Sequence, residues 1–126
     1  MKGHLLLVGG TLETLIDLCI CLGHYFSTTT LAVTDDIAAR TVSSAEGEFD
    51  AIVVYLDGSE DPRDLGIILH HRPNILMVAK DPRSPACRQI KVDGGLVVSI
   101  HEPKAVLQAS LLMLPTRHRP ATKTSD

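Results

Sequence analysis

The chain has 126 residues, 44% of them apolar, and a net charge of −3 at neutral pH. A chain of this length can bury about two-thirds of its unfolded surface, so we expect one domain with one core. The small acidic charge offers no general attraction to nucleic acid or anionic lipid. No apolar run approaches the roughly 18 residues that span a bilayer, and no signal peptide precedes Leu5. We therefore expect a soluble, cytoplasmic protein that binds neither nucleic acid nor membranes.

The cysteine and serine contexts argue against a catalytic site. Cys19 and Cys21 fall in a predicted helix, where side chains two positions apart point in different directions, and Cys87 leaves the set odd. We predict three reduced thiols. No serine stands in a G-x-S-x-G turn. We expect no enzyme activity, no cofactor and no metal site.

The first predicted unit is a buried strand that turns into an amphipathic helix. The apolar run Leu5–Val8 stops at Gly9 and Gly10, which is typical of a central strand followed by a helix. The next segment, 12–22, has apolar residues at helical spacing and ends at Gly23. The spacing predicts a core-facing set of Leu12, Leu15, Ile16, Cys19 and Ile20.

The second predicted unit begins with residues 28–34, whose β-branched content favours a strand. Asp35 is the expected N-cap of a helix that runs through Val42 and ends at Gly47.

The third unit begins with residues 51–56, which are almost continuously apolar. Such a run indicates a strand covered on both faces, and hence a parallel sheet. Asp57–Gly58 is expected to close it. Asp61 followed by Pro62 predicts the start of a helix, which must end before Pro73.

Two more strands and helices complete the pattern. Residues 75–78 form the fourth predicted strand, and Ser84 with Pro85 begins a short helix that ends near Lys91. Residues 96–100 form the fifth predicted strand.

The last predicted helix starts at Pro103 and ends at Pro115. Residues 116–126 are polar and lack apolar periodicity, so we expect a domain over 1–115 and a disordered tail. The apolar positions at helical spacing in the last helix are Val106, Leu107, Leu111 and Leu114.

Five strand-then-helix units predict an α/β fold with right-handed crossovers. The arrangement expected is a flavodoxin-like, doubly wound parallel sheet of order 2-1-3-4-5, with helices on both faces. In such sheets the functional site lies beyond the carboxyl ends of the strands.

Residues 4–114 resemble the receiver domain of bacterial two-component response regulators. The resemblance rests on Leu5–Val8 at the end of the first strand, Phe49–Asp50 before the third, Asn74–Val78 in the fourth and Asp93–Gly95 before the fifth. These are patterns of apolar residues and turns, so they imply the fold more than the chemistry.

Receivers of this family work through five groups at the carboxyl edge of the sheet, and this chain has a different residue at each position. The magnesium-binding acidic pair falls on Gly9 and Gly10, and the phosphoaccepting aspartate falls on Tyr55. The hydroxyl residue that ends strand four falls on Ala79, and the conserved lysine of the family falls on His101.

These replacements remove the groups that aspartyl phosphorylation needs. Magnesium at a protein site is usually anchored by one or two carboxylates, whereas two glycines supply only backbone groups. Loss of the hydroxyl and the lysine removes groups that would hold the phosphoryl group. We interpret the chain as a pseudo-receiver: a signalling or interaction module that has lost the phosphorylation site and acts through protein contacts or dimerisation.

Two alternative functions remain open at the sheet edge. Asp57 lies two residues past Tyr55, on the same side of an extended strand, and would be the phosphoacceptor if the register shifted. Otherwise Asp57 and Gly58 form the turn that follows the strand. The Gly9–Gly10 turn is an alternative site for a small anionic ligand, because backbone N–H groups at a helix start attract anions.

Lys80 and His101 should lie near the sheet edge that holds Tyr55 and Asp57. Together these residues would form a small polar crevice, which either binds a small anion or is ordinary surface.

The partner is expected to be a signalling protein or a second copy of the chain. In receivers the usual docking face is formed by the fourth helix, fifth strand and fifth helix, which correspond here to residues 86–91, 96–100 and 103–114. The last helix has more apolar residues than one buried stripe requires, which favours a homodimer through this helix and the fifth strand.

Overall fold

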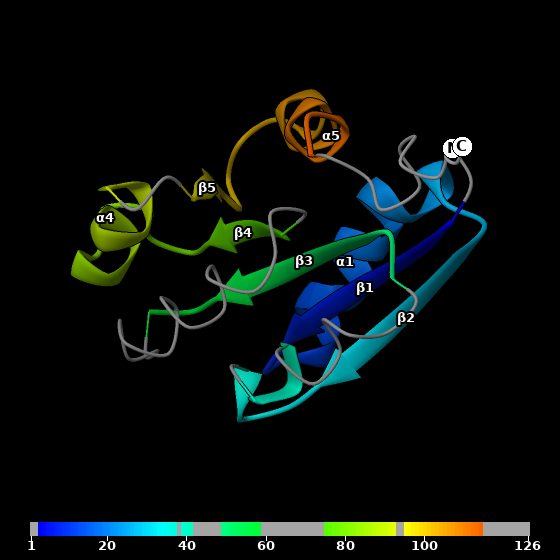
Figure 1. Ribbon diagram of the computed structural model, residues 1–126, viewed down its shortest axis with the longest axis horizontal. Helices are drawn as coiled ribbons and strands as arrows, with labels where there is room; N and C mark the ends of the chain where they lie inside the picture. Colours follow the sequence, from blue (N-terminus) through cyan, green and yellow to red (C-terminus); the bar gives the residue numbers. More distant parts are fainter. Residues whose placement is uncertain (1–2, 38, 42–48, 59–74, 93–94, 115–126) are drawn as a thin grey trace, which may run out of the picture.

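The computed structural model describes residues 3–37, 39–41, 49–58, 75–92 and 95–114. Five parallel strands form one sheet in the order β2-β1-β3-β4-β5 (Figure 1). The strands are β1 (His4–Gly9), β2 (Thr28–Val33), β3 (Ala51–Leu56), β4 (Ile75–Ala79) and β5 (Leu96–Ser99). The helices are α1 (Leu12–Leu22), the 3-10 turn η1 (Gly23–Tyr25), α4 (Pro85–Val92) and α5 (Lys104–Leu112). The predicted flavodoxin-like order is confirmed.

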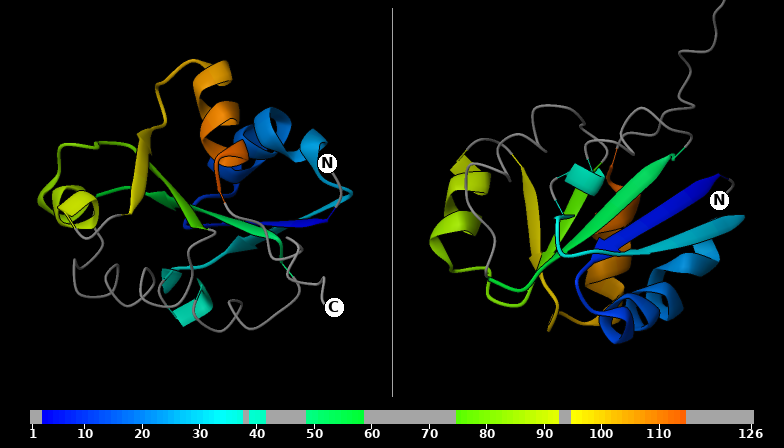
Figure 2. Two further views of the ribbon diagram at one scale, coloured as in Figure 1. Left: turned by 45° about the horizontal axis from the view of Figure 1, so that its top comes forward. Right: turned by 90° about the horizontal axis from the view of Figure 1, so that it is seen from below.

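The core consists of two layers, because alternate side chains of each strand point to opposite faces of the sheet. On β1, Leu6 and Val8 face one layer, which α4 covers with Cys87 and Ile90. Residues on the opposite face pack under α1 and α5, which lie together on one side of the sheet (Figure 2). Core residues of this second layer include Leu5, Leu7, Val53, Val78, Leu107 and Leu111. Burial on both faces explains the continuous apolar runs of the central strands.

The predicted core face of α1 is right for Leu15, which is fully buried, and wrong for Leu12, Ile16 and Ile20. The structure buries Leu15, Leu18 and Leu22, whereas Leu12, Ile16 and Ile20 are 50%, 42% and 68% exposed. Cys19 is half-buried and packs at the margin of the core. Both sets follow helical spacing, so periodicity alone does not choose between them. The choice is made by contact with the sheet, where the Leu15 side chain packs directly over Gly9.

Helix starts agree with the sequence in one case and are shifted in another. The Cys87 backbone N–H donates to Ser84 Oγ at 3.3 Å, so Ser84 caps α4 as predicted. After β2, however, the cap is Asp36 rather than Asp35. The Ala39 backbone N–H donates to Asp36 Oδ1 at 3.1 Å, and Thr34 Oγ1 in turn accepts from the Asp36 backbone N–H.

Several element ends differ by one residue from the predictions. β2 ends one residue early, β4 continues to Ala79, and Ile100 belongs to the turn after β5. α4 extends one residue past Lys91. Gly23 closes α1 with a right-handed φ of −65°, so the chain continues into η1 instead of turning away sharply.

The last helix runs from Lys104 to Leu112, with Pro103 as its N-cap residue. Leu107, Leu111 and Leu114 are buried as predicted, but Val106 is 39% exposed. The predictions for the helix starting at Asp61, for the ends at Gly47 and Pro115 and for the tail 116–126 lie outside the described residues.

The amino end of the sheet is held by the residues that precede β3. The His4 backbone N–H donates to Asp50 Oδ2 at 2.7 Å, and the Asp50 backbone N–H donates to the His4 carbonyl at 2.8 Å. The His4 ring lies 4.5 Å from the Phe49 ring and contacts Thr30 Oγ1 through Nε2 at 2.7 Å. Asp50 is only 4% exposed. The Phe49–Asp50 pair therefore has a structural role far from the carboxyl edge.

Among the described residues, no helix has the length and apolar character needed to cross a lipid bilayer.

Candidate functional site

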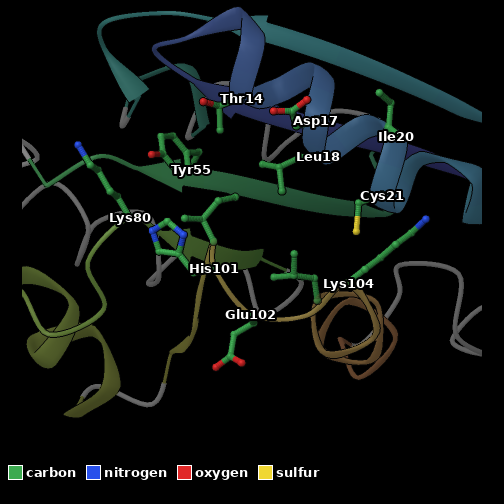
Figure 3. A pocket seen from close by; sticks show the side chains of 12 residues that line it. Thr14, Asp17, Leu18, Ile20, Cys21, Tyr55, Lys80, His101, Glu102 and Lys104 are labelled. Atoms are coloured by element: carbon green, nitrogen blue, oxygen red, sulfur yellow. The ribbon is translucent and has the colours of Figure 1, made fainter.

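A cavity of about 490 Å³ opens at the carboxyl edge of the sheet and extends between α1 and α5 (Figure 3). β3 and the segments after β4 and β5 form one end, where Tyr55, Lys80 and His101 lie. The helical walls are lined by Thr14, Asp17, Leu18, Ile20, Cys21, Lys104 and Leu107. The location is the one expected for a site in a parallel α/β sheet.

Tyr55 occupies the middle of the sheet edge. It is half-buried on β3, level with Val78 on the neighbouring strand, and its side chain lines the cavity. Gly9 lies beside it on β1: a Cβ atom on Gly9 would be 3.3 Å from Tyr55 Cβ and 3.0 Å from Leu15 Cδ2. Because Gly9 has no side chain, Tyr55 and Leu15 can approach the backbone of β1 closely.

Backbone hydrogen bonds fix the segments that carry the two basic groups. The Lys80 N–H donates to the Leu56 carbonyl at 2.9 Å, and the Ile100 N–H donates to the Ala79 carbonyl at 2.8 Å. The His101 N–H donates to Ser99 Oγ at 3.0 Å. The Lys80 backbone therefore continues the sheet pairing beyond the end of β4, whereas His101 lies in a turn, one residue after the last paired residue, Ile100.

The structure brings together three of the four residues expected in the polar crevice. Tyr55, Lys80 and His101 line one cavity, whereas Asp57 is exposed and does not line it. Gly58, which follows Asp57, has a φ of +103°, a conformation that favours glycine. This geometry supports the interpretation of Asp57–Gly58 as a turn after β3.

The other sequence-predicted positions contribute backbone rather than side chains. Ala79 is 1% exposed and pairs with Leu56 and Ser99 on its two sides, so it belongs to the core. Gly9 is buried and Gly10 is exposed. Thr11 is the N-cap residue of α1, but its side chain makes no capping hydrogen bond.

The end of the cavity farthest from the sheet edge contains a thiol and an ammonium group. Burial raises the pKa of the Cys21 thiol, and the positive charge of Lys104 lowers it by a smaller amount. The Gln108 side-chain amide donates to the Cys21 carbonyl at 3.0 Å, which joins α5 to α1 at this point. All three cysteines are free thiols, as predicted.

Sequence reasoning missed the helical walls of the cavity. Helix α1 supplies the lining residues Thr14, Asp17, Leu18 and Cys21. Whether these residues share a cavity with α5 depends on the angle at which α1 crosses α5. Helical periodicity does not encode that crossing. The one available signal was the position of Lys104 at the start of the last helix, close to the end of the fifth strand.

The charged groups of the lining are the basic residues Lys80, His101 and Lys104 together with the carboxylates Asp17 and Glu102. Among the described residues, no group of three or more histidine, cysteine, aspartate or glutamate side chains is arranged to hold a metal ion. This arrangement can bind a charged ligand electrostatically next to an apolar wall.

Comparison with known proteins supports the fold assignment. The chain matches the crystal structure of the signal receiver domain of an HD domain-containing protein from Pseudomonas fluorescens Pf-5, with a TM-score of 0.69 and 19% identity over 90% of this chain and 94% of that one. It also matches a fusion containing the yeast Spc42 trimeric coiled coil, amino acids 181–211, with a TM-score of 0.64 and 12% identity over 90% of this chain and 81% of that one. At such low identity these matches establish the receiver-type fold and not an activity. No protein-family model and no curated protein matches the sequence.

Proposed function

We propose that this chain is a receiver-like signalling module that does not use aspartyl phosphorylation and acts, without catalysis, through contacts with a protein partner. The observation that carries the proposal is the residue set at the carboxyl edge of a receiver-type sheet. There, a phenol lines the cavity at the acceptor position on β3, and glycine replaces both acids after β1.

The chemistry of these side chains supports the first half of the proposal. An acyl phosphate needs a carboxylate, which Tyr55 lacks, and a bound magnesium ion needs carboxylate oxygens close to the acceptor. Gly9 and Gly10 offer none. Asp57 is exposed outside the cavity, after the end of β3. Ala79, in the core at the end of β4, has no hydroxyl to bind a phosphoryl oxygen.

Exposed apolar side chains on α5 and on its C-cap residue, Met113, support the second half. Val106, Leu112 and Met113 are 39%, 46% and 74% exposed, although the helix already buries Leu107 and Leu111. β5 is an edge strand whose residues are all half-buried. Exposed apolar side chains on the last helix and an edge strand each fit a protein partner, either a signalling protein or a second copy of the chain.

Phosphorylation is tested with acetyl phosphate or beryllium fluoride plus Mg²⁺, recorded by amide spectra of the full chain. We expect no saturable shifts at the cavity, with a phosphorylatable receiver as the positive control. Shifts that cluster at Asp57 and disappear in Asp57→Asn would contradict the proposal.

The contact surface is tested by light scattering over a range of concentrations. If the chain self-associates through α5, Met113→Asp should lower the apparent mass, whereas Ile16→Asp on α1 should not. A wild-type chain that is monomeric at every concentration would exclude the dimer and leave a different protein as the partner.

A further inference from the structure

The cavity between α1 and α5 has a lining that changes character along its length. One end is basic, with Lys80 and His101 next to the Tyr55 ring. The middle is apolar, because Leu18 and Leu107 face it from the two helices. Its volume of about 490 Å³ lies within the range of about 300–1,000 Å³ that is usual for small-molecule sites.

We propose that this cavity binds an amphipathic organic anion. The apolar body of the ligand lies between α1 and α5, and its single anionic head group lies at Lys80 and His101. This site is distinct from the Gly9–Gly10 turn, and its occupation requires no phosphoryl transfer.

Charge complementarity selects the head group. Lys80 is exposed at the mouth of the cavity and forms no ion pair with any described residue, so its ammonium group is available to an anion. The His101 ring lies on the same side of the cavity (Figure 3). Two basic residues at the mouth favour an anion there over the apolar middle of the cavity.

The carboxylate of Asp17 disfavours a second anionic group in the middle of the cavity. Asp17 projects from the α1 wall between the Lys80–His101 end and the Lys104 end, and it would repel an anionic group placed beside it. The Glu102 side chain points away from the space between the helices in Figure 3.

The apolar wall selects the body of the ligand. Leu18 and Leu107 are almost fully buried, and Ile20, 68% exposed, extends the wall toward solvent. The apolar surface that a ligand can cover belongs to Ile20 and to the half-buried Tyr55 and Ile100, in front of the two leucines. A ring or short alkyl chain that covers these three side chains removes apolar surface from water, which favours binding. A small inorganic anion has no such body and should bind poorly.

The test uses two matched probes with the intact chain. The anionic probe is 8-anilinonaphthalene-1-sulfonate, and the neutral probe is N-phenyl-1-naphthylamine, which has the same aromatic body without the sulfonate. We expect saturable fluorescence with the sulfonate probe and amide shifts at Leu18, Tyr55, Lys80 and Leu107, but not at Ile90 of α4 on the other face. Shifts confined to other residues would overturn the proposal.

Variants then separate the head group from the body. The exposed Lys80 cation is worth about threefold in affinity, and a hydrogen bond from the His101 ring to the head group is worth about as much, so Lys80→Gln combined with His101→Gln should weaken the sulfonate probe about tenfold and change the neutral probe by less than about twofold. Lys91→Gln, on the exposed side of α4, is the matched control and should change neither. If the double variant does not fold, Lys80→Gln alone should show the threefold effect. An unchanged sulfonate affinity, or inorganic phosphate binding as tightly as the sulfonate probe, would refute the proposed site.

Discussion

Replacing Gly9 or Gly10 by alanine tests how closely the sheet edge is packed. A Cβ on Gly9 would stand 3.0 Å from Leu15 Cδ2 and 3.3 Å from Tyr55 Cβ, closer than ordinary van der Waals contact. Such overpacking costs about 1–3 kcal/mol, whereas replacing a strand glycine by alanine gains about 0.5–1 kcal/mol. We therefore expect Gly9→Ala to lower the free energy of unfolding by about 1 kcal/mol.

Gly10→Ala is the matched control for that experiment. The nearest atom to a Cβ on Gly10 is the Thr34 carbonyl oxygen at 3.7 Å, and Gly10 does not have a positive φ. The substitution should therefore be neutral or stabilise the protein by up to about 1 kcal/mol. Thermal or urea unfolding measures both variants, and 1 kcal/mol corresponds to roughly 4 °C in a domain of this size. If Gly9→Ala unfolded at the wild-type midpoint or above it, the close-packing argument would be wrong.

Three further tests by urea unfolding address other parts of the fold. Asp50→Ala removes the buried acceptor of the His4 N–H and should cost about 1.5–3 kcal/mol. Asp36→Ala should cost about 1 kcal/mol, whereas Asp35→Ala should change the free energy of unfolding by less than about 0.5 kcal/mol. A larger loss in Asp35→Ala than in Asp36→Ala would show that Asp35 is the N-cap, as predicted from the sequence. Leu15→Ala should cost about 2–5 kcal/mol, against less than about 1 kcal/mol for the 42% exposed Ile16→Ala. Equal losses would contradict the observed face of α1.

The strand order could be predicted from the sequence because its signals are local and agree with one another. Runs such as 51–56 are apolar at every position, and glycine or proline stands near the ends of most of them. Only a sheet covered on both faces accommodates such runs. The start of α4 at Ser84–Pro85 could also be predicted from the sequence, because the cap and the proline act within one turn of the helix.

The buried face of α1 and the cavity could not be predicted in the same way. The helical period is satisfied equally well by the exposed residues Leu12, Ile16 and Ile20 and by the three buried leucines. The buried set is selected by a contact with another element, in which Leu15 packs against Gly9 of β1. Leu18 and Leu107 share a cavity only because of the angle at which their helices pack. These facts depend on tertiary geometry, to which a one-dimensional pattern is insensitive.

The same packing limits how a phosphoacceptor site could be introduced at this edge. Tyr55→Asp would supply the acceptor carboxylate, but one carboxylate leaves magnesium without a second anchor. Aspartate at Gly9 would bring its Cβ against Leu15 and Tyr55, whereas Gly10 has space for a side chain. We therefore expect Gly10→Asp combined with Tyr55→Asp to show saturable, Mg²⁺-dependent amide shifts at the sheet edge, and expect neither single variant to do so. Equal Mg²⁺ shifts in Tyr55→Asp alone would show that the glycines are not what prevents metal binding, and would remove the main physical support for a receiver-like module without phosphorylation.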